Sequence, residues 1–192
     1  MQRKRIFYCL LGYLCCGLLL SGCGDKTEGE KTVQTVVYQN EDYGYQIELP
    51  ENWTVESGGD KTQIYALSPN GDLALNIVCE LGGFNYYTPQ DLALTIAEAT
   101  TASFEDVSVI LDREITDFPQ SHRVAVNGKS AEGIHTVVDV SLLQPIEGIH
   151  YYLIISGGID EYREFSAQWE KMLKSFSCTK TAEEMYQISL EQ

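Results

Sequence analysis

Residues 149–176 read IHYYLIISGGIDEYREFSAQWEKMLKSF, and this stretch decides the fold. Its first seven residues are apolar on both alternating faces apart from one histidine, which is typical of a central strand covered above and below. Apolar residues then recur at helical spacing: Tyr162, Phe165, Trp169, Met172, Leu173 and Phe176. Acidic residues stand in the first turn of this helix and lysines in its last, as the helix dipole favours. We interpret the stripe as core and expect no cofactor.

The segments before this stretch carry further strand and turn patterns. We expect strands at residues 35–38, 45–49, 54–56, 62–68 and 72–81. Asn70-Gly71 between the last two is a strong hairpin signal. Thr88 and Pro89 supply an N-cap and a first helical position, which predicts a helix over 88–103. Later strands are expected at 107–115, 122–126, 134–143 and 149–156, with Asn127-Gly128 and Glu147-Gly148 as turns.

The two ends of this pattern resemble a known superfamily. Residues 45–55, YQIELPENWTV, are similar to the opening of the PsbP/Mog1-like superfamily, where a strand runs into Pro-x-x-Trp. The strand at 151–155 and the helix closing on LKSF at 173–176 look like that family's last strand and C-terminal helix. The resemblance covers residues 35–178. It implies an α+β fold with an antiparallel sheet of about six or more strands sandwiched by helices.

The resemblance also sets an expectation of function. Family members of known role mostly bind or stabilise other proteins, and the family offers no catalytic motif to carry over. A shared fold licenses an expectation of binding and no mechanism.

The N-terminus is typical of an export signal. Three cationic residues at 3–5 precede an uncharged apolar run from Ile6 to Leu20, which is short for a spanning helix. The run ends in Leu20-Ser21-Gly22-Cys23, which resembles the lipobox of bacterial lipoproteins. This resemblance implies that Cys23 receives a diacylglyceryl thioether and becomes the new N-terminus, so that acyl chains hold the protein to the membrane lipid outside the cytoplasm.

Cleavage before Cys23 sets the predicted organisation. Residues 1–22 are the signal, 23–34 the lipidated cysteine and a flexible tether, 35–180 the domain, and 181–192 a C-terminal tail. Loss of the three leader cations moves the formal net charge from −15 to −18. Such acidity argues against nucleic acid as a partner.

Two cysteines, Cys79 and Cys178, remain in the expected domain. Outside the cytoplasm they could form a disulfide. Cys79 also alternates in register with the apolar residues of strand 72–81, as a simple buried thiol does. Both alternatives stay open.

Candidate catalytic and metal residues are few. The three histidines, His122, His135 and His150, have no paired ligand spacing, and we interpret them as solvated strand residues without a metal. No nucleophile motif such as Gly-x-Ser-x-Gly occurs, so we expect no enzyme activity and assign no catalytic residue. The acids Asp112, Glu114 and Asp117 could meet a cation or form a polar strand face.

The aromatic residues Phe84, Tyr86 and Tyr87 stand in a loop rather than in a periodic element. Exposed aromatics are common binding anchors. The alternative is that Phe84 and Tyr87 fold back under the following helix as a hydrophobic staple. The first hypothesis of function is therefore a membrane-anchored, non-enzymatic accessory protein that binds an envelope or secreted protein. The second is an extracytoplasmic module that binds a small molecule or cation.

Overall fold

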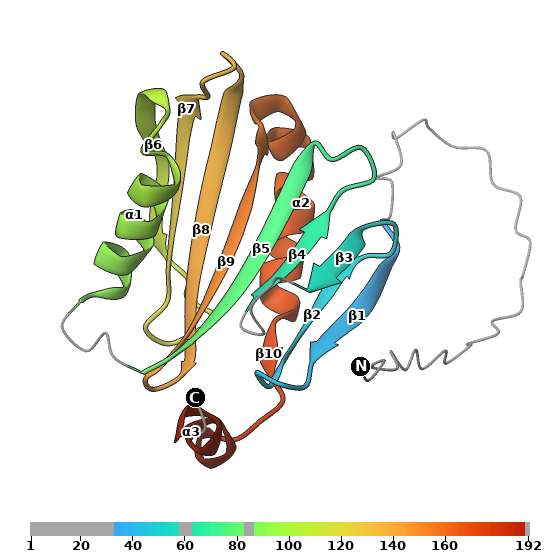
Figure 1. The fold of residues 1–192 in the computed structure, drawn as a ribbon, viewed down its shortest axis with the longest axis vertical. Coiled ribbons are helices and arrows are strands. Elements are labelled where there is room, and N and C mark those ends of the chain that lie inside the picture. The colour runs from blue at the N-terminus through green and yellow to red at the C-terminus, as the bar shows by residue number, and fades with distance from the viewer. Residues whose placement is uncertain (1–32, 58–62, 83–86, 191–192) are drawn as a thin grey trace, which may run out of the picture. The chain divides into compact units, whose positions relative to one another are not determined.

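A computed structural model describes residues 33–57, 63–82 and 87–190 (Figure 1). Their main element is a seven-stranded sheet in the order β3-β4-β5-β9-β8-β7-β6. Its strands are β3 (Thr54–Ser57), β4 (Gln63–Leu67), β5 (Leu73–Leu81), β6 (Glu105–Glu114), β7 (His122–Lys129), β8 (His135–Ile146) and β9 (Ile149–Gly158). Every neighbouring pair is antiparallel.

A second, three-stranded sheet has the order β1-β2-β10. Its strands are β1 (Thr35–Asn40), β2 (Tyr45–Pro50) and β10 (Ser177–Cys178). The helices of the described residues are α1 (Pro89–Thr100), α2 (Ile159–Ser175) and α3 (Ala182–Leu190). Within the described residues, none of these helices is both long and apolar enough to cross a bilayer.

The two faces of the large sheet carry different helices. Cross-strand partners point to the same face, and Val140 of β8 lies opposite Val124 of β7 and Ile154 of β9. We call this the α1 face, because α1 packs on it over β7 and β8. The alternate residues form the α2 face, where α2 packs against β8 and β9. Figure 1 shows α1 in front of the sheet and α2 behind it.

The larger core lies on the α2 face. The predicted stripe of α2 is confirmed, since Trp169, Met172 and Leu173 are buried, as is Phe176 at the C-cap. Trp53 of the Pro-x-x-Trp segment stacks on Phe165 of α2 with a ring-centroid distance of 5.2 Å. The segment after β2 is therefore fixed to the helix by an aromatic pair, which adds about 0.5–1.5 kcal/mol beyond its buried area.

The smaller core lies under α1. The helix begins as the sequence predicts, because Thr88 and Asp91 form a reciprocal capping box and Pro89 occupies the first helical position. Leu92, Ala93 and Ala97 are its buried residues. Small alanines let the helix lie close to β7 and β8. The α+β class, with an antiparallel sheet between helices, is confirmed.

Two local features differ from the sequence predictions. Asn127-Gly128 is not a turn, because β7 continues through it to Lys129 and the chain reverses at 130–133, where Gly133 has a φ of 80°. A Cβ on Gly128 would lie 3.1 Å from the Phe104 side chain, so this glycine serves close packing. The segment 181–192, expected as a tail, contains α3, and its Met185 is fully buried in the larger core.

Candidate functional site

Part of the α1 face has no helix of the described chain packed over it. This open half consists of the face of β4, β5 and β9, and it presents Tyr65, Leu67, Val78, Glu80 and Ile154. Tyr65 is 42% and Leu67 38% exposed, although both belong to a strand of the sheet. Apolar residues exposed together on a sheet are characteristic of an interaction surface.

A groove of about 470 Å³ runs along this surface beside α1. Val78 and Ile154 form its floor, and Ile96 of α1 forms its side. Gln90 of α1 donates to both carboxylate oxygens of Asp112 on β6, at 3.1 and 2.9 Å. This contact ties the start of α1 to the far edge of the sheet, which leaves β5 and β9 accessible beside the helix.

One end of the groove is polar. The Tyr152 hydroxyl donates a hydrogen bond of 2.9 Å to Oε2 of Glu80, and burial together with this carboxylate raises the pKa of Tyr152. His150 stacks on Tyr152 with a centroid distance of 6.3 Å, and its burial lowers its pKa. The groove therefore has an apolar floor with one carboxylate at its polar end.

The predicted aromatic loop lies between β5 and α1 in the sequence. Of its three candidate residues, Phe84 and Tyr86 lie outside the described residues. Tyr87 is 58% exposed, so the alternative in which it folds back under the helix does not hold for this residue. The capping box of Thr88 holds the helix start without it.

A buried ionic network lies on the opposite, α2 face. Asp139 is fully buried and accepts hydrogen bonds from Arg123 Nε at 2.9 Å and from Arg123 Nη2 at 2.6 Å. Trp169 Nε1, at 3.2 Å, and the Tyr162 hydroxyl donate to the same carboxylate. Arg123 also pairs with Glu170 of α2. The network fixes α2 to β7 and β8 through the buried Arg123, Asp139 and Trp169, while Glu170 remains 41% exposed at its rim.

Sequence reasoning did not find this network. Its signal is one charged residue in each of two apolar strands, Arg123 in HRVAV and Asp139 in VVDV. A buried charge requires an opposite charge nearby. A search for charged residues inside apolar strands would have paired them.

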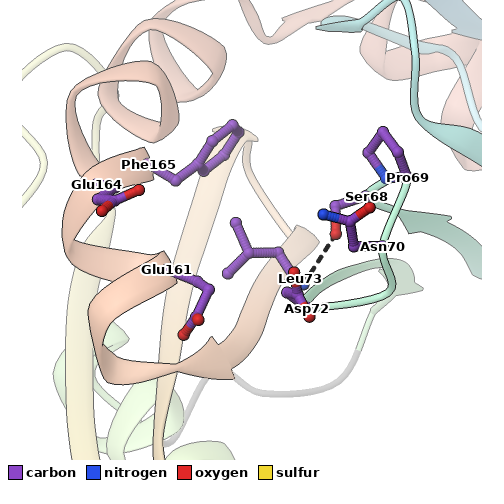
Figure 2. Close-up of a pocket in the computed structure, with 8 residues that line it drawn as sticks. All are labelled: Ser68, Pro69, Asn70, Asp72, Leu73, Glu161, Glu164 and Phe165. Atoms are coloured by element: carbon purple, nitrogen blue, oxygen red, sulfur yellow. Dashed lines mark hydrogen bonds between the residues drawn. The ribbon is translucent and has the colours of Figure 1, made fainter.

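A second, shallower pocket of about 250 Å³ lies between the β4–β5 turn and the first turns of α2 (Figure 2). Asp72, Glu161 and Glu164 give it three carboxylates, while Leu73 and Phe165 supply apolar atoms. The Ser68 hydroxyl accepts a hydrogen bond from the Leu73 amide at 3.0 Å, which shapes the turn. Among the described residues, no three His, Cys, Asp or Glu side chains are grouped to hold a metal ion.

The structure places the three histidines differently from one another. His135 is exposed, as predicted. The prediction of solvated side chains is wrong for the two others, since His122 is 8% and His150 4% exposed. His122 Nε2 lies 2.5 Å from Oδ1 of Asp112, and this hydrogen bond with that from Gln90 lowers the pKa of Asp112. Asp112 therefore binds His122 of β7 and Gln90 of α1, while Glu114 and Asp117 are exposed.

Cys79 and Cys178 are both free thiols in the structure. The Tyr151 hydroxyl forms a hydrogen bond with Cys178 Sγ over 3.8 Å and also contacts Cys79. Burial raises the pKa of Cys79 to about 12, and it raises that of Cys178 as well. Cys23 lies outside the described residues.

Comparisons with solved structures agree with the predicted fold. The chain is similar to the PsbP protein of the cyanobacterium Synechocystis, at 12% identity and a TM-score of 0.56, over 83% of this chain and 98% of that chain. It is also similar to the Ran-binding protein Mog1p of Saccharomyces cerevisiae, at 10% identity and a TM-score of 0.60, over 79% and 98% of the two chains. No family model matches this chain, and no curated protein matches it. The fold is PsbP/Mog1-like.

Proposed function

We propose that this chain is a non-enzymatic accessory protein that is anchored to a bacterial membrane and binds an envelope protein or a secreted protein. Cys23 carries the lipid, and the domain faces outside the cytoplasm. The partner contacts the open half of the α1 face and the adjoining loop.

The exposed apolar surface on β4, β5 and β9 is the observation that carries the binding role. Burial of apolar area stabilises a complex by about 25 cal/mol per Å² before the costs of association. Leu67, Val78 and Ile154 together supply apolar surface on the α1 face next to α1. The solved Mog1p is by its description a Ran-binding protein, and this fold is therefore compatible with a protein-binding role.

The anchoring role is supported by the sequence at the N-terminus. Leu20-Ser21-Gly22-Cys23 follows an apolar run of the length of an export signal. The first strand begins at Thr35, so a tether of residues 24–34 separates Cys23 from the fold. Fully extended, this tether would span about 35 Å, enough to hold the domain clear of the lipid headgroups.

The second candidate function is an extracytoplasmic module that binds a small molecule or cation. The pocket with three carboxylates in Figure 2 is the observation that favours it. A ligand of this pocket would be a small cationic molecule with an apolar part, because Phe165 and Leu73 stand beside the acids.

In-cell crosslinking tests the first function against the second. The full-length chain is crosslinked in living cells, recovered from membranes, and compared with a Cys23→Ala variant that is still exported. We expect one or two crosslinked proteins in near-stoichiometric yield, reduced in the variant because anchoring concentrates both proteins at the membrane. The absence of any reproducible partner would contradict the protein-binding role and favour ligand screens on the carboxylate pocket.

A further inference from the structure

The two faces of the large sheet differ in charge. Four carboxylates lie on strands of the α1 face by register, and α1 adds two more: Glu56, Glu80, Asp112, Glu114, Asp91 and Glu98. Within the described ranges, no lysine or arginine lies on this face or on α1. The described cations instead lie on the α2 face, on α2 itself or beside α3: Arg113, Arg123, Lys129, Arg163, Lys171, Lys174 and Lys180.

This asymmetry determines the charge of anything that binds the open half. Glu80 is at the polar end of the groove, and its Oε2 already accepts the Tyr152 hydroxyl. Its second oxygen can accept a donor from a partner. An acidic partner would meet the Glu80 carboxylate at the polar end of the groove, and like charges in contact cost several kcal/mol. A second copy of this chain that presented the same face would meet that repulsion.

The backbone of the open half determines the conformation of the partner. β5 pairs with β4 and β9, and β9 pairs with β5 and β8, so both strands have their backbone groups bonded on each side. A partner segment lying on this surface cannot add a hydrogen-bonded strand. It must satisfy its own backbone groups, as a helix does.

The width of the surface also fits one helix. Strands are spaced by about 4.8 Å, so β9, β5 and β4 together offer about 10–14 Å. A helix with its side chains is about 10–12 Å across. α1 already covers β7 and β8 in this way, and a second helix beside it would contact Ile96, Val78 and Ile154 through an apolar stripe.

We propose that the partner of this protein inserts an amphipathic helix with lysine or arginine on its flanks into the groove beside α1, where it completes the helical layer of the α1 face. This inference rests on the proposed protein-binding function. It adds the chemistry and the secondary structure of the element that is bound.

Site-specific photocrosslinking of the full-length chain in cells tests the proposal. A photoreactive amino acid replaces Leu67 in the open half, or Lys174, which is exposed on α2, as the matched control. We expect a protein crosslinked from position 67 and not from 174. The crosslinked peptide of the partner should carry apolar residues at i, i+3 or i+4 and at least two flanking Lys or Arg.

The other outcomes of the photocrosslinking experiment each contradict a different part of the proposal. Crosslinks from 174 alone would leave the protein-binding function standing and overturn the assigned groove. A crosslinked peptide that is acidic, that alternates like a strand, or that comes from this chain itself would overturn the cationic helix. No crosslink from either position would overturn the protein-binding function and the inference with it.

Charge variants separate attraction from folding. Glu80→Lys should lower the crosslink yield from position 67 by about tenfold or more, since a like charge then faces the partner. Glu51→Lys makes the same charge change at an exposed residue after β2, outside both pockets, and should leave the yield within about twofold. Equal yields from the two variants would overturn the charge complementarity, provided that both melt within a few degrees of the parent.

Discussion

Tyr152 and Glu80 are joined across β9 and β5 by a hydrogen bond of 2.9 Å at the polar end of the groove. The phenol donates, so the carboxylate is held against the sheet and its position is set before any partner arrives. Because Glu80 is already ordered, binding a partner loses less side-chain entropy. Ordering a flexible side chain on binding costs about 0.5–1.5 kcal/mol.

Tyr152→Phe therefore has two expected effects. It removes one hydrogen bond to a carboxylate on a partly exposed residue, and the free energy of unfolding should fall by about 1 kcal/mol. It also frees Glu80 to move, so partner binding should weaken by severalfold while the apolar floor stays intact. Urea unfolding followed by tryptophan fluorescence measures the first effect, because Trp53 and Trp169 are both buried. Unchanged stability would show that the bond contributes nothing.

Asp139→Leu should destabilise the fold by about 3–5 kcal/mol, because it leaves the Arg123 guanidinium buried without its main counter-charge. The double variant Arg123→Met with Asp139→Leu should recover most of that loss, since no buried charge then remains. Urea unfolding of the single and double variants gives the coupling energy. A double variant at least as unstable as Asp139→Leu would contradict this account of the network.

The stability of the fold should fall as the pH drops below about 6.5, the ordinary pKa of histidine. Burial lowers the pKa of His150 in the folded state, so the unfolded chain takes up a proton first. Its contribution is present above pH 6.5 and is lost as the pH falls toward the folded pKa. His150→Phe keeps the stack on Tyr152 and should reduce the change in the free energy of unfolding between pH 7 and pH 5. His135→Phe, at an exposed site, is the control and should leave that pH dependence unchanged. An unchanged slope in His150→Phe would contradict the assignment.

Met185→Ala should cost about 2–5 kcal/mol, as expected for a large residue removed from a core. Leu190→Ala in the same helix is the control, because Leu190 is 63% exposed and its loss should change stability by less than about 0.5 kcal/mol. Similar effects from both variants would indicate that α3 does not pack through Met185.

The thiols of Cys79 and Cys178 should react with iodoacetamide much more slowly than an open thiol at pH 8. Burial raises the pKa of both, so the reactive thiolate is scarce and poorly accessible. Unfolding in urea without reductant should make both react. If the unfolded protein recovered from the envelope reacts at these two cysteines only after a reductant is added, the exported chain contains a Cys79–Cys178 disulfide. That result would contradict the free thiols of the structure.

Local patterns predicted most of the elements and few of the contacts. The Asn70-Gly71 hairpin, the Thr88 cap and the apolar stripe of α2 each depend on residues close in sequence, and each is present. Asn127-Gly128 misled the prediction because a glycine can serve a turn or a close contact, and only the position of Phe104 decides between them.

The candidate site was beyond such patterns. Its surface combines β4, β5, β9 and α1, and it is accessible because α1 packs over β7 and β8 instead. The charge of the α1 face likewise depends on strand register, which sets the direction of each carboxylate. The sequence also singled out Tyr87, which the structure shows to be 58% exposed, and its role in binding stays a prediction.

The central claim is that the protein acts outside the cytoplasm while lipid on Cys23 holds it to the membrane. Two measurements on the chain in its membrane test this most directly. Intact-mass analysis of the chain recovered from membranes shows whether Cys23 is modified, and proteolysis of whole protoplasts shows on which side of the membrane the domain lies. The account predicts a mature chain that begins at Cys23, carries the mass of a diacylglyceryl group and is digested from outside. A chain that retains residues 1–22, or an unmodified Cys23 on a protein protected inside the cell, would contradict it.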